Sequence, residues 1–114
     1  MRAQRFLISL AVMTASITLL CGGAQAADAE KQLVIKNHRF EPPELKVPAG
    51  QRVKLIVHNQ DSTPEEFESH SLNREKVIPG GAKASLFIGP LKPGRYAFVG
   101  EYNEATAKGV IVAE

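Results

Sequence analysis

Sulfur is scarce in this sequence of 114 residues, which contains one cysteine, two methionines and no tryptophan. The cysteine, Cys21, and both methionines, Met1 and Met13, lie in the N-terminal fifth of the chain. Beyond Cys21, therefore, no disulfide can form and no thiolate is available to bind a metal ion. A metal site in that part of the chain would need oxygen and nitrogen ligands.

Residues 1–26 have the three parts of a secretory signal peptide. Two arginines give a positive start, residues 6–20 are mostly apolar, and an Ala-Gln-Ala site ends at Ala26. Because the apolar run is short for a membrane span, we predict cleavage after Ala26, export to the periplasm and no stable membrane insertion afterwards. Lipidation of Cys21 is the alternative, although Leu20 stands where a lipoprotein signal usually has a small residue.

Cleavage would also change the charge of the protein. The 14 basic residues fall to 12 when Arg2 and Arg5 are removed, which equals the 12 acidic residues and gives a net charge of zero with neutral histidines. A neutral chain offers no electrostatic attraction for nucleic acid, so we expect no nucleic-acid partner. Residues 27–114 are long enough to form one domain with its own core.

Short apolar or alternating segments, separated by Pro, Gly and Asn, predict an all-β fold. No stretch of ten or more residues keeps helical spacing without a Pro or Gly interrupting it. About six to eight short strands at roughly ten-residue spacing are typical of an antiparallel sandwich or barrel. The clearest strands are Val53–Val57, Glu66–Leu72, Ala84–Ile88, Arg95–Val99 and Gly109–Val112. We expect the core to contain Leu55, Val57, Phe67, Phe87, Tyr96 and Phe98.

One predicted strand carries side chains that bind metals, in the segment Pro64-Glu65-Glu66-Phe67-Glu68-Ser69-His70. Alternate residues of a strand project to the same face, which places Glu66, Glu68 and His70 together, about 6–7 Å apart. Carboxylates and imidazole suit iron, manganese, zinc or copper(II). Glu65 points to the opposite face and would replace Glu66 only after a register shift of one residue. The competing interpretation is a solvated edge strand whose charges prevent aggregation.

The order of motifs along the chain resembles the cupredoxin fold. The motifs are Phe40-Glu41-Pro42, Leu45-Lys46-Val47-Pro48-Ala49-Gly50, Asn59-Gln60-Asp61, Val77-Ile78-Pro79-Gly80-Gly81, Leu91-Lys92-Pro93-Gly94-Arg95-Tyr96-Ala97-Phe98 and Gly109-Val110-Ile111-Val112. Their joint order and spacing carry the resemblance, which extends over nearly all of the chain after the signal peptide. It implies that residues 27–114 form an antiparallel Greek-key β-sandwich of cupredoxin topology.

Blue-copper cupredoxins bind copper through a histidine after the Asn-x-Asp loop and a Cys-His-Met set after the Tyr-x-Phe strand. Here Glu65 falls nearest the first histidine position. Gly100 stands two residues beyond Phe98, where the cysteine would be, and the loop up to Thr106 has neither His nor Met. Because a blue-copper centre needs a thiolate, we expect no type 1 copper centre and no conventional electron carrier.

The segment Glu66-Phe67-Glu68 also resembles the Glu-aromatic-Glu strand of EfeO-type cupredoxin-like domains, which belong to periplasmic iron-uptake systems of bacteria. This resemblance implies a role in ferrous-iron uptake, with a copper or iron ion as the bound metal. It also implies a periplasmic iron-binding protein and an iron permease as partners. Glu66 and Glu68 are then the leading candidates for metal ligands.

Four further residues are candidate ligands, each with an ordinary solvated role as its alternative. His70 shares the face of the acidic strand, and His38 precedes Phe40 in a loop along the metal-bearing end of cupredoxins. Glu101 and Glu104 lie in the loop that normally carries three copper ligands. A second hypothesis for the whole protein is a metal-free β-sandwich whose acidic strand docks a periplasmic partner. The sequence leaves open whether the protein is an enzyme.

Overall fold

The computed structural model describes residues 28–114, so the predicted signal peptide and its cleavage site lie outside the described part. The described residues form nine strands and one short 3-10 helix: β1 (Ala29–Lys36), β2 (Arg39–Glu41), β3 (Glu44–Val47), β4 (Val53–Asn59), β5 (Glu65–Ser69), β6 (Arg74–Ile78), β7 (Lys83–Ile88), β8 (Gly94–Gly100), η1 (Glu101–Asn103) and β9 (Lys108–Ala113). Within 28–114, no helix is long and apolar enough to cross a bilayer. The all-β prediction is confirmed.

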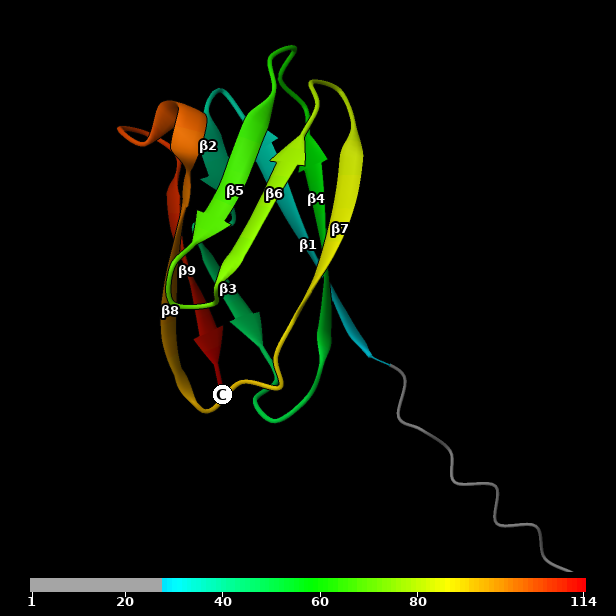
Figure 1. The fold of residues 1–114 in the computed structure, drawn as a ribbon, viewed down its shortest axis with the longest axis vertical. Coiled ribbons are helices and arrows are strands. Elements are labelled where there is room, and N and C mark those ends of the chain that lie inside the picture. The colour runs from blue at the N-terminus through cyan, green and yellow to red at the C-terminus, as the bar shows by residue number, and fades with distance from the viewer. Residues whose placement is uncertain (1–27) are drawn as a thin grey trace, which may run out of the picture.

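The strands form two sheets that pack face to face (Figure 1). One sheet has the order β2-β1-β4-β7, and the other has the order β3-β9-β8-β5-β6. Most neighbours are antiparallel, as predicted, but β1 pairs with β4 and β3 pairs with β9 in parallel. Both sheets are therefore mixed. Each parallel pair joins strands far apart in sequence, because a tight hairpin can connect only antiparallel strands.

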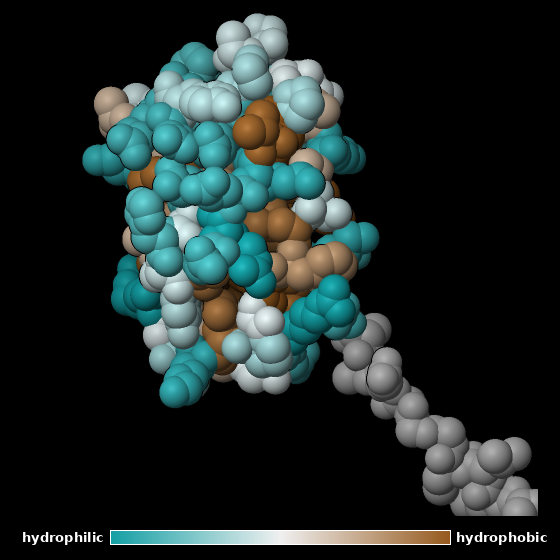
Figure 2. Space-filling model, viewed as in Figure 1, coloured by the Kyte–Doolittle hydropathy of each residue, from teal (hydrophilic) through white to brown (hydrophobic). Residues whose placement is uncertain are grey.

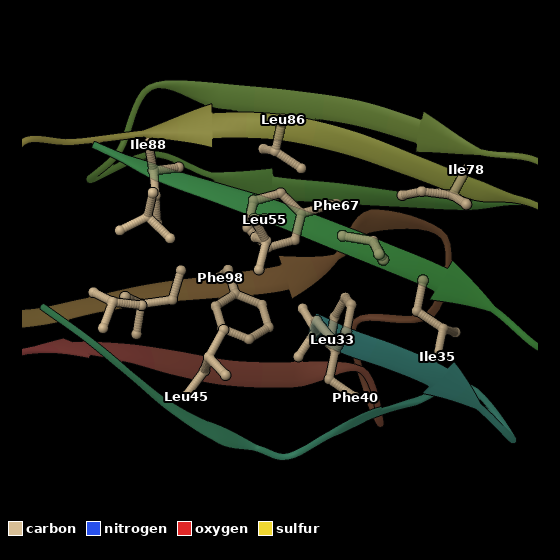
Figure 3. Packing of buried hydrophobic residues seen from close by; sticks show 14 of the residues in the cluster. Leu33, Ile35, Phe40, Leu45, Leu55, Phe67, Ile78, Leu86, Ile88 and Phe98 are labelled. Atoms are coloured by element: carbon tan, nitrogen blue, oxygen red, sulfur yellow. The ribbon is translucent and has the colours of Figure 1, made fainter. Parts of the chain in front are cut away.

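Three phenylalanines form the centre of the core between the sheets (Figure 3). The rings of Phe67 and Phe98 stack with centroids 5.1 Å apart, and Phe40 contacts the Phe98 ring edge-on at 4.9 Å. Such pairs contribute about 0.5–1.5 kcal/mol beyond the area that they bury. Because Phe67 lies on β5 and Phe98 on β8, this packing fixes the two strands that carry the candidate site.

The predicted core is correct at Leu55, Val57, Phe67 and Phe98, which are all buried. Tyr96 is half-buried against the core, and its hydroxyl donates to the Lys92 carbonyl oxygen at 2.8 Å.

The prediction is wrong for Phe87, which is 38% exposed. On β7 the alternating residues Leu86 and Ile88 point inward, which turns Phe87 outward. There the guanidinium of Arg52 covers its ring, 3.9 Å from the centroid.

The β1–β2, β4–β5 and β8–β9 connections meet at one end of the sandwich, toward the top of Figure 1. The carboxylate of Asp61 accepts hydrogen bonds from the backbone N–H of Asn37 at 2.8 Å and of His38 at 2.9 Å. The hydroxyl of Thr106 donates to the His38 carbonyl oxygen. These bonds tie the β1–β2 turn to the β4–β5 and β8–β9 loops.

Candidate functional site

The candidate site lies on the outer face of β5, where Glu66 and Glu68 project from the sandwich. Their neighbours Glu65, Phe67 and Ser69 are buried, so the strand alternates as predicted. The view of Figure 2 shows hydrophilic side chains over much of the face that β5, β6 and η1 present. The two leading candidates thus lie on one accessible face of the five-stranded sheet.

Glu101 reaches the same outer face from the end of β8, the strand that pairs with β5. Gly100 pairs with Phe67, and the chain then enters η1, which begins at Glu101. A hydrogen bond between the Glu101 and Glu66 carboxyl groups raises the pKa of Glu66 to about 6, with partial loss of hydration and the Glu101 charge as further causes. Two carboxyl groups can share a hydrogen bond only if one holds a proton. Below about pH 6 the protonated carboxyl of Glu66 donates this bond to Glu101, and at neutral pH that proton is mostly lost.

Glu75 is a fourth member of this acidic group, and sequence reasoning missed it. It lies on β6 directly opposite Glu68, and its charge contributes to the raised pKa of both Glu66 and Glu68. For Glu68 the largest cause of the raised pKa is partial loss of hydration, followed by the hydrogen bond to Glu101. Glu75 lies on β6 (Arg74–Ile78), which is not among the strands predicted from the sequence. A tight turn over residues 70–73 would have placed Glu75 opposite Glu68.

His70 also reaches the site, although it does not lie on the strand. The predicted strand Glu66–Leu72 ends at Ser69, and His70 begins the turn to β6. Its Nε2 nevertheless lies 3.4 Å from Oε1 of Glu68, with the imidazole 93% exposed. A hollow of about 330 Å³ lies beside this pair; it is lined by Glu68, Ser69, His70, Asn73, Arg74 and Glu75.

His38 and Glu104 are placed differently from the other candidates. Nδ1 of His38 lies 3.7 Å from Oδ2 of Asp61, so its charged neighbour is Asp61. Glu104 directly follows η1 and is exposed. Across residues 28–114, no three His, Cys, Asp or Glu side chains are arranged to hold a metal ion. The structure nevertheless places four of the candidate ligands on one face: Glu66, Glu68, Glu101 and His70. We call these four residues and Glu75 the acidic face.

Glu65 lies on the other side of β5 and is 1% exposed. Its Oε1 accepts hydrogen bonds from the backbone N–H of Glu66 at 3.0 Å and of Tyr102 at 2.9 Å. Its Oε2 accepts from Nδ2 of Asn103 at 2.6 Å. The register shift that would have turned Glu65 outward does not occur.

Glu65 and Gly100 stand nearest the positions where blue-copper cupredoxins place a histidine and the cysteine. A Cβ on Gly100 would lie 2.6 Å from the carboxyl carbon of Glu65 and 2.7 Å from Cβ of Ala107. A side chain at Gly100 would therefore collide with its surroundings. With a carboxylate in one position and no side chain in the other, these residues do not fit a type 1 copper centre.

Comparisons with known proteins agree with the fold and its topology. The family model described as a cupredoxin-like domain matches residues 7–113. An uncharacterized protein of Rickettsia prowazekii (strain Madrid E) is 42% identical over 83 residues, which cover 73% of this chain and 66% of that protein. This chain therefore spans just under two thirds of that relative's length.

Solved structures with the same fold are more distant in sequence. Auracyanin A, a "blue" copper protein from Chloroflexus aurantiacus, superimposes with a TM-score of 0.64 at 15% identity over 77% of this chain and 100% of its own. A purple cupredoxin from Nitrosopumilus maritimus gives 0.58 at 20% identity over 76% and 100%. These likenesses establish the cupredoxin fold alone. From the family match over residues 7–113, the chain belongs to the cupredoxin-like domain family.

Proposed function

We propose that this protein is a periplasmic, EfeO-type cupredoxin-like protein that binds copper or iron on the acidic face and acts in ferrous-iron uptake. The observation that carries the proposal is the placement of the Glu66, Glu68 and Glu101 carboxyl groups on one face, where their mutual effects raise the pKa of Glu66 and of Glu68. Carboxylates held this close repel one another at neutral pH. A cation bound between these carboxylates would remove that repulsion.

The chemistry of the donors supports a hard or borderline cation. The acidic face offers carboxylate oxygens and the imidazole of His70, which suit Fe(III) and Cu(II) better than the softer Cu(I). Glu66, Glu68 and Glu101 would hold the ion, and small rotations of these outward-facing side chains would bring their oxygens together. Ligands that favour the higher oxidation state assist oxidation of ferrous iron, or retention of ferric iron before delivery to a permease.

The location of the acidic face supports delivery of a metal to a partner. Glu101 is exposed, and the imidazole of His70 is almost fully so. An ion held there would lie at the surface, where the ligands of another protein can reach it. The Glu66-Phe67-Glu68 motif supports iron uptake as the setting, with a periplasmic iron-binding protein and an iron permease as partners. The predicted signal peptide supports the periplasm as the compartment.

Calorimetric titration of residues 27–114 with Cu(II) and with Fe(III) near neutral pH tests the proposal. The variant Glu66→Gln/Glu68→Gln keeps the shape of both side chains, removes both charges and should abolish binding. A control variant, Glu30→Gln/Glu41→Gln, removes two charges from exposed positions on the other sheet and should bind as the original chain does. Affinity weaker than roughly 100 µM for both metals, about −5.5 kcal/mol, would exclude the proposal.

A metal-free docking module is the second candidate function. Tyr102, which follows Glu101, is 52% exposed, and tyrosine is enriched in protein interfaces. The acidic face and this ring would suit a basic partner in the periplasm. Failure of the metal titration, together with binding of a lysine-rich peptide that Glu66→Gln/Glu68→Gln abolishes, would favour this candidate.

A further inference from the structure

The buried carboxylate of Glu65 has no part in the proposed metal site, yet it connects the segments that form it. Its Oε1 accepts the backbone N–H of Glu66 on β5 and the backbone N–H of Tyr102 in η1. Tyr102 directly follows Glu101. One oxygen atom thus joins the backbone of Glu66 to that of the residue beside Glu101. The register agrees, since Phe67, which follows Glu66, pairs with Gly100, which precedes Glu101.

The second oxygen of Glu65 holds the rest of η1. Nδ2 of Asn103 donates to Oε2 of Glu65 at 2.6 Å. The carbonyl oxygen of Asn103 in turn accepts the backbone N–H of Thr106 at 3.1 Å and of Ala107 at 2.8 Å. Asn103 therefore links Glu65 to the return of the chain into β9. The loop between β8 and β9 is therefore held by hydrogen bonds that lead back to the carboxylate of Glu65.

Space around Glu65 is filled on the side of β8. A Cβ on Gly100 would lie 2.6 Å from its carboxyl carbon, so the carboxylate packs directly against the backbone that leads into η1. With three N–H donors and 1% exposure, the carboxylate has no room to turn toward solvent. A buried acceptor with several donors is costly to disturb, because each donor left without a partner loses about 1–3 kcal/mol.

We propose that Glu65 is the positioning residue of the acidic face: its two oxygens hold η1 against β5 and thereby place Glu101 beside Glu66 before any metal binds. The claim about metal rests on the proposed function, but the placement of Glu101 does not. If Glu65 acts through its hydrogen bonds, its negative charge is not required. Any side chain at residue 65 that accepts from the two backbone N–H groups and matches its partner at residue 103 should suffice.

A swap of donor and acceptor between residues 65 and 103 tests this prediction. Asn103→Asp sets a second carboxylate against Oε2 of Glu65 and should open the contact, without change to any core residue. Adding Glu65→Gln to that variant restores the contact, because the glutamine amide donates to the new aspartate while its oxygen accepts from Glu66 and Tyr102. Glu65→Gln alone should be tolerated, since the Asn103 amide can turn to accept from the glutamine amide.

Two NMR measurements on the metal-free protein read out the result. Hydrogen exchange of the Tyr102 amide should accelerate at least about tenfold in Asn103→Asp, and return close to the original rate in Glu65→Gln/Asn103→Asp. Nuclear Overhauser contacts between the Glu66 and Glu101 side chains should weaken in Asn103→Asp and return in Glu65→Gln/Asn103→Asp. Glu30→Gln is the control, since it removes an exposed charge on β1 and should change neither measurement. Unchanged exchange in Asn103→Asp, or failure of the double variant to recover, would overturn the role of Glu65.

Metal affinity separates this inference from the proposed function. If the original chain binds Cu(II), Asn103→Asp should weaken binding at least about tenfold and the double variant should recover it. Equal Cu(II) affinity in all three proteins would overturn Glu65 as the positioning residue. If the original chain binds no metal, the proposed function fails, and the exchange and Overhauser measurements still decide whether Glu65 places Glu101.

Discussion

Glu68 on β5 and Glu75 on β6 lie directly opposite each other, as partners in the antiparallel register of the two strands. Like charges in this arrangement destabilise a sheet. The repulsion contributes to the raised pKa of Glu68, and the neighbouring His70 offsets part of it. An unfavourable pair on an otherwise well-packed sheet indicates a role other than stability, and a cation bound on the acidic face would relieve it.

Replacing Glu75 by threonine should stabilise the metal-free protein by about 0.5–1 kcal/mol. The change removes a like charge opposite Glu68 and introduces a residue that favours strands. Urea unfolding at neutral pH measures the gain. Glu44→Thr is the matched control, since Glu44 is also exposed on an edge strand but has the guanidinium of Arg95 3.6 Å away. No gain in Glu75→Thr relative to the control would contradict the repulsion.

The stability of the metal-free protein should fall as the pH rises through about 6. The hydrogen bond that protonated Glu66 donates to Glu101 raises the pKa of Glu66 from 4.5 to about 6 in the folded protein. A group with a raised folded pKa contributes stability that is complete below pH 4.5 and lost as the pH passes the folded value. Melting temperatures between pH 4.5 and 7.5 should therefore decline more steeply in the original chain than in Glu66→Gln. Parallel curves would disprove the shared proton.

Asp61 should show the opposite dependence on the acid side. The backbone N–H of His38 lowers the pKa of Asp61 below 3.8, with partial loss of hydration opposing it. Its contribution is complete above pH 3.8 and lost as the pH falls through the lower folded value. Asp61→Ala should cost about 1–3 kcal/mol at pH 7, because two N–H groups lose their acceptor. Asp61→Asn, which keeps one oxygen, should cost less in the same urea experiment.

The sequence predicted the features that depend on local alternation. Apolar residues at every second position indicated β4, and the period of two along β5, with Phe67 facing inward, placed Glu66 and Glu68 outward and Glu65 inward. Phe87 was wrongly assigned to the core because the pattern of its strand does not show whether Phe87 or its neighbours Leu86 and Ile88 face inward. The parallel pairs between distant strands have no local signal at all.

The contacts that assemble the acidic face depend on residues distant along the chain. Glu65 meets Tyr102 and Asn103 at separations of 37 and 38 residues, and nothing near any of the three indicates the others. Glu75 was within reach of prediction, because a turn over 70–73 fixes its register opposite Glu68. Loop residues such as His38 were harder to place, since the backbone at His38 has a positive φ of 55° and is held by a hydrogen bond to Asp61.

Metal should raise the melting temperature of the original chain but not that of Glu66→Gln/Glu68→Gln. A ligand that binds only the folded state at a hundredfold excess over its dissociation constant adds about 2.7 kcal/mol, which corresponds to roughly 10 °C or more in a domain of this size. Differential scanning calorimetry with Cu(II) measures the shift.

The shift should shrink as the pH falls below about 6, because protons compete with the metal for the Glu66 oxygens. His70→Ala should reduce it by less than the double variant does, since a neutral ligand contributes less attraction than two carboxylates. The matched control Glu30→Gln/Glu41→Gln should keep the full shift. An equal shift in Glu66→Gln/Glu68→Gln would move the metal to the Glu101–Glu104 loop and leave Glu66 and Glu68 as a solvated face of β5.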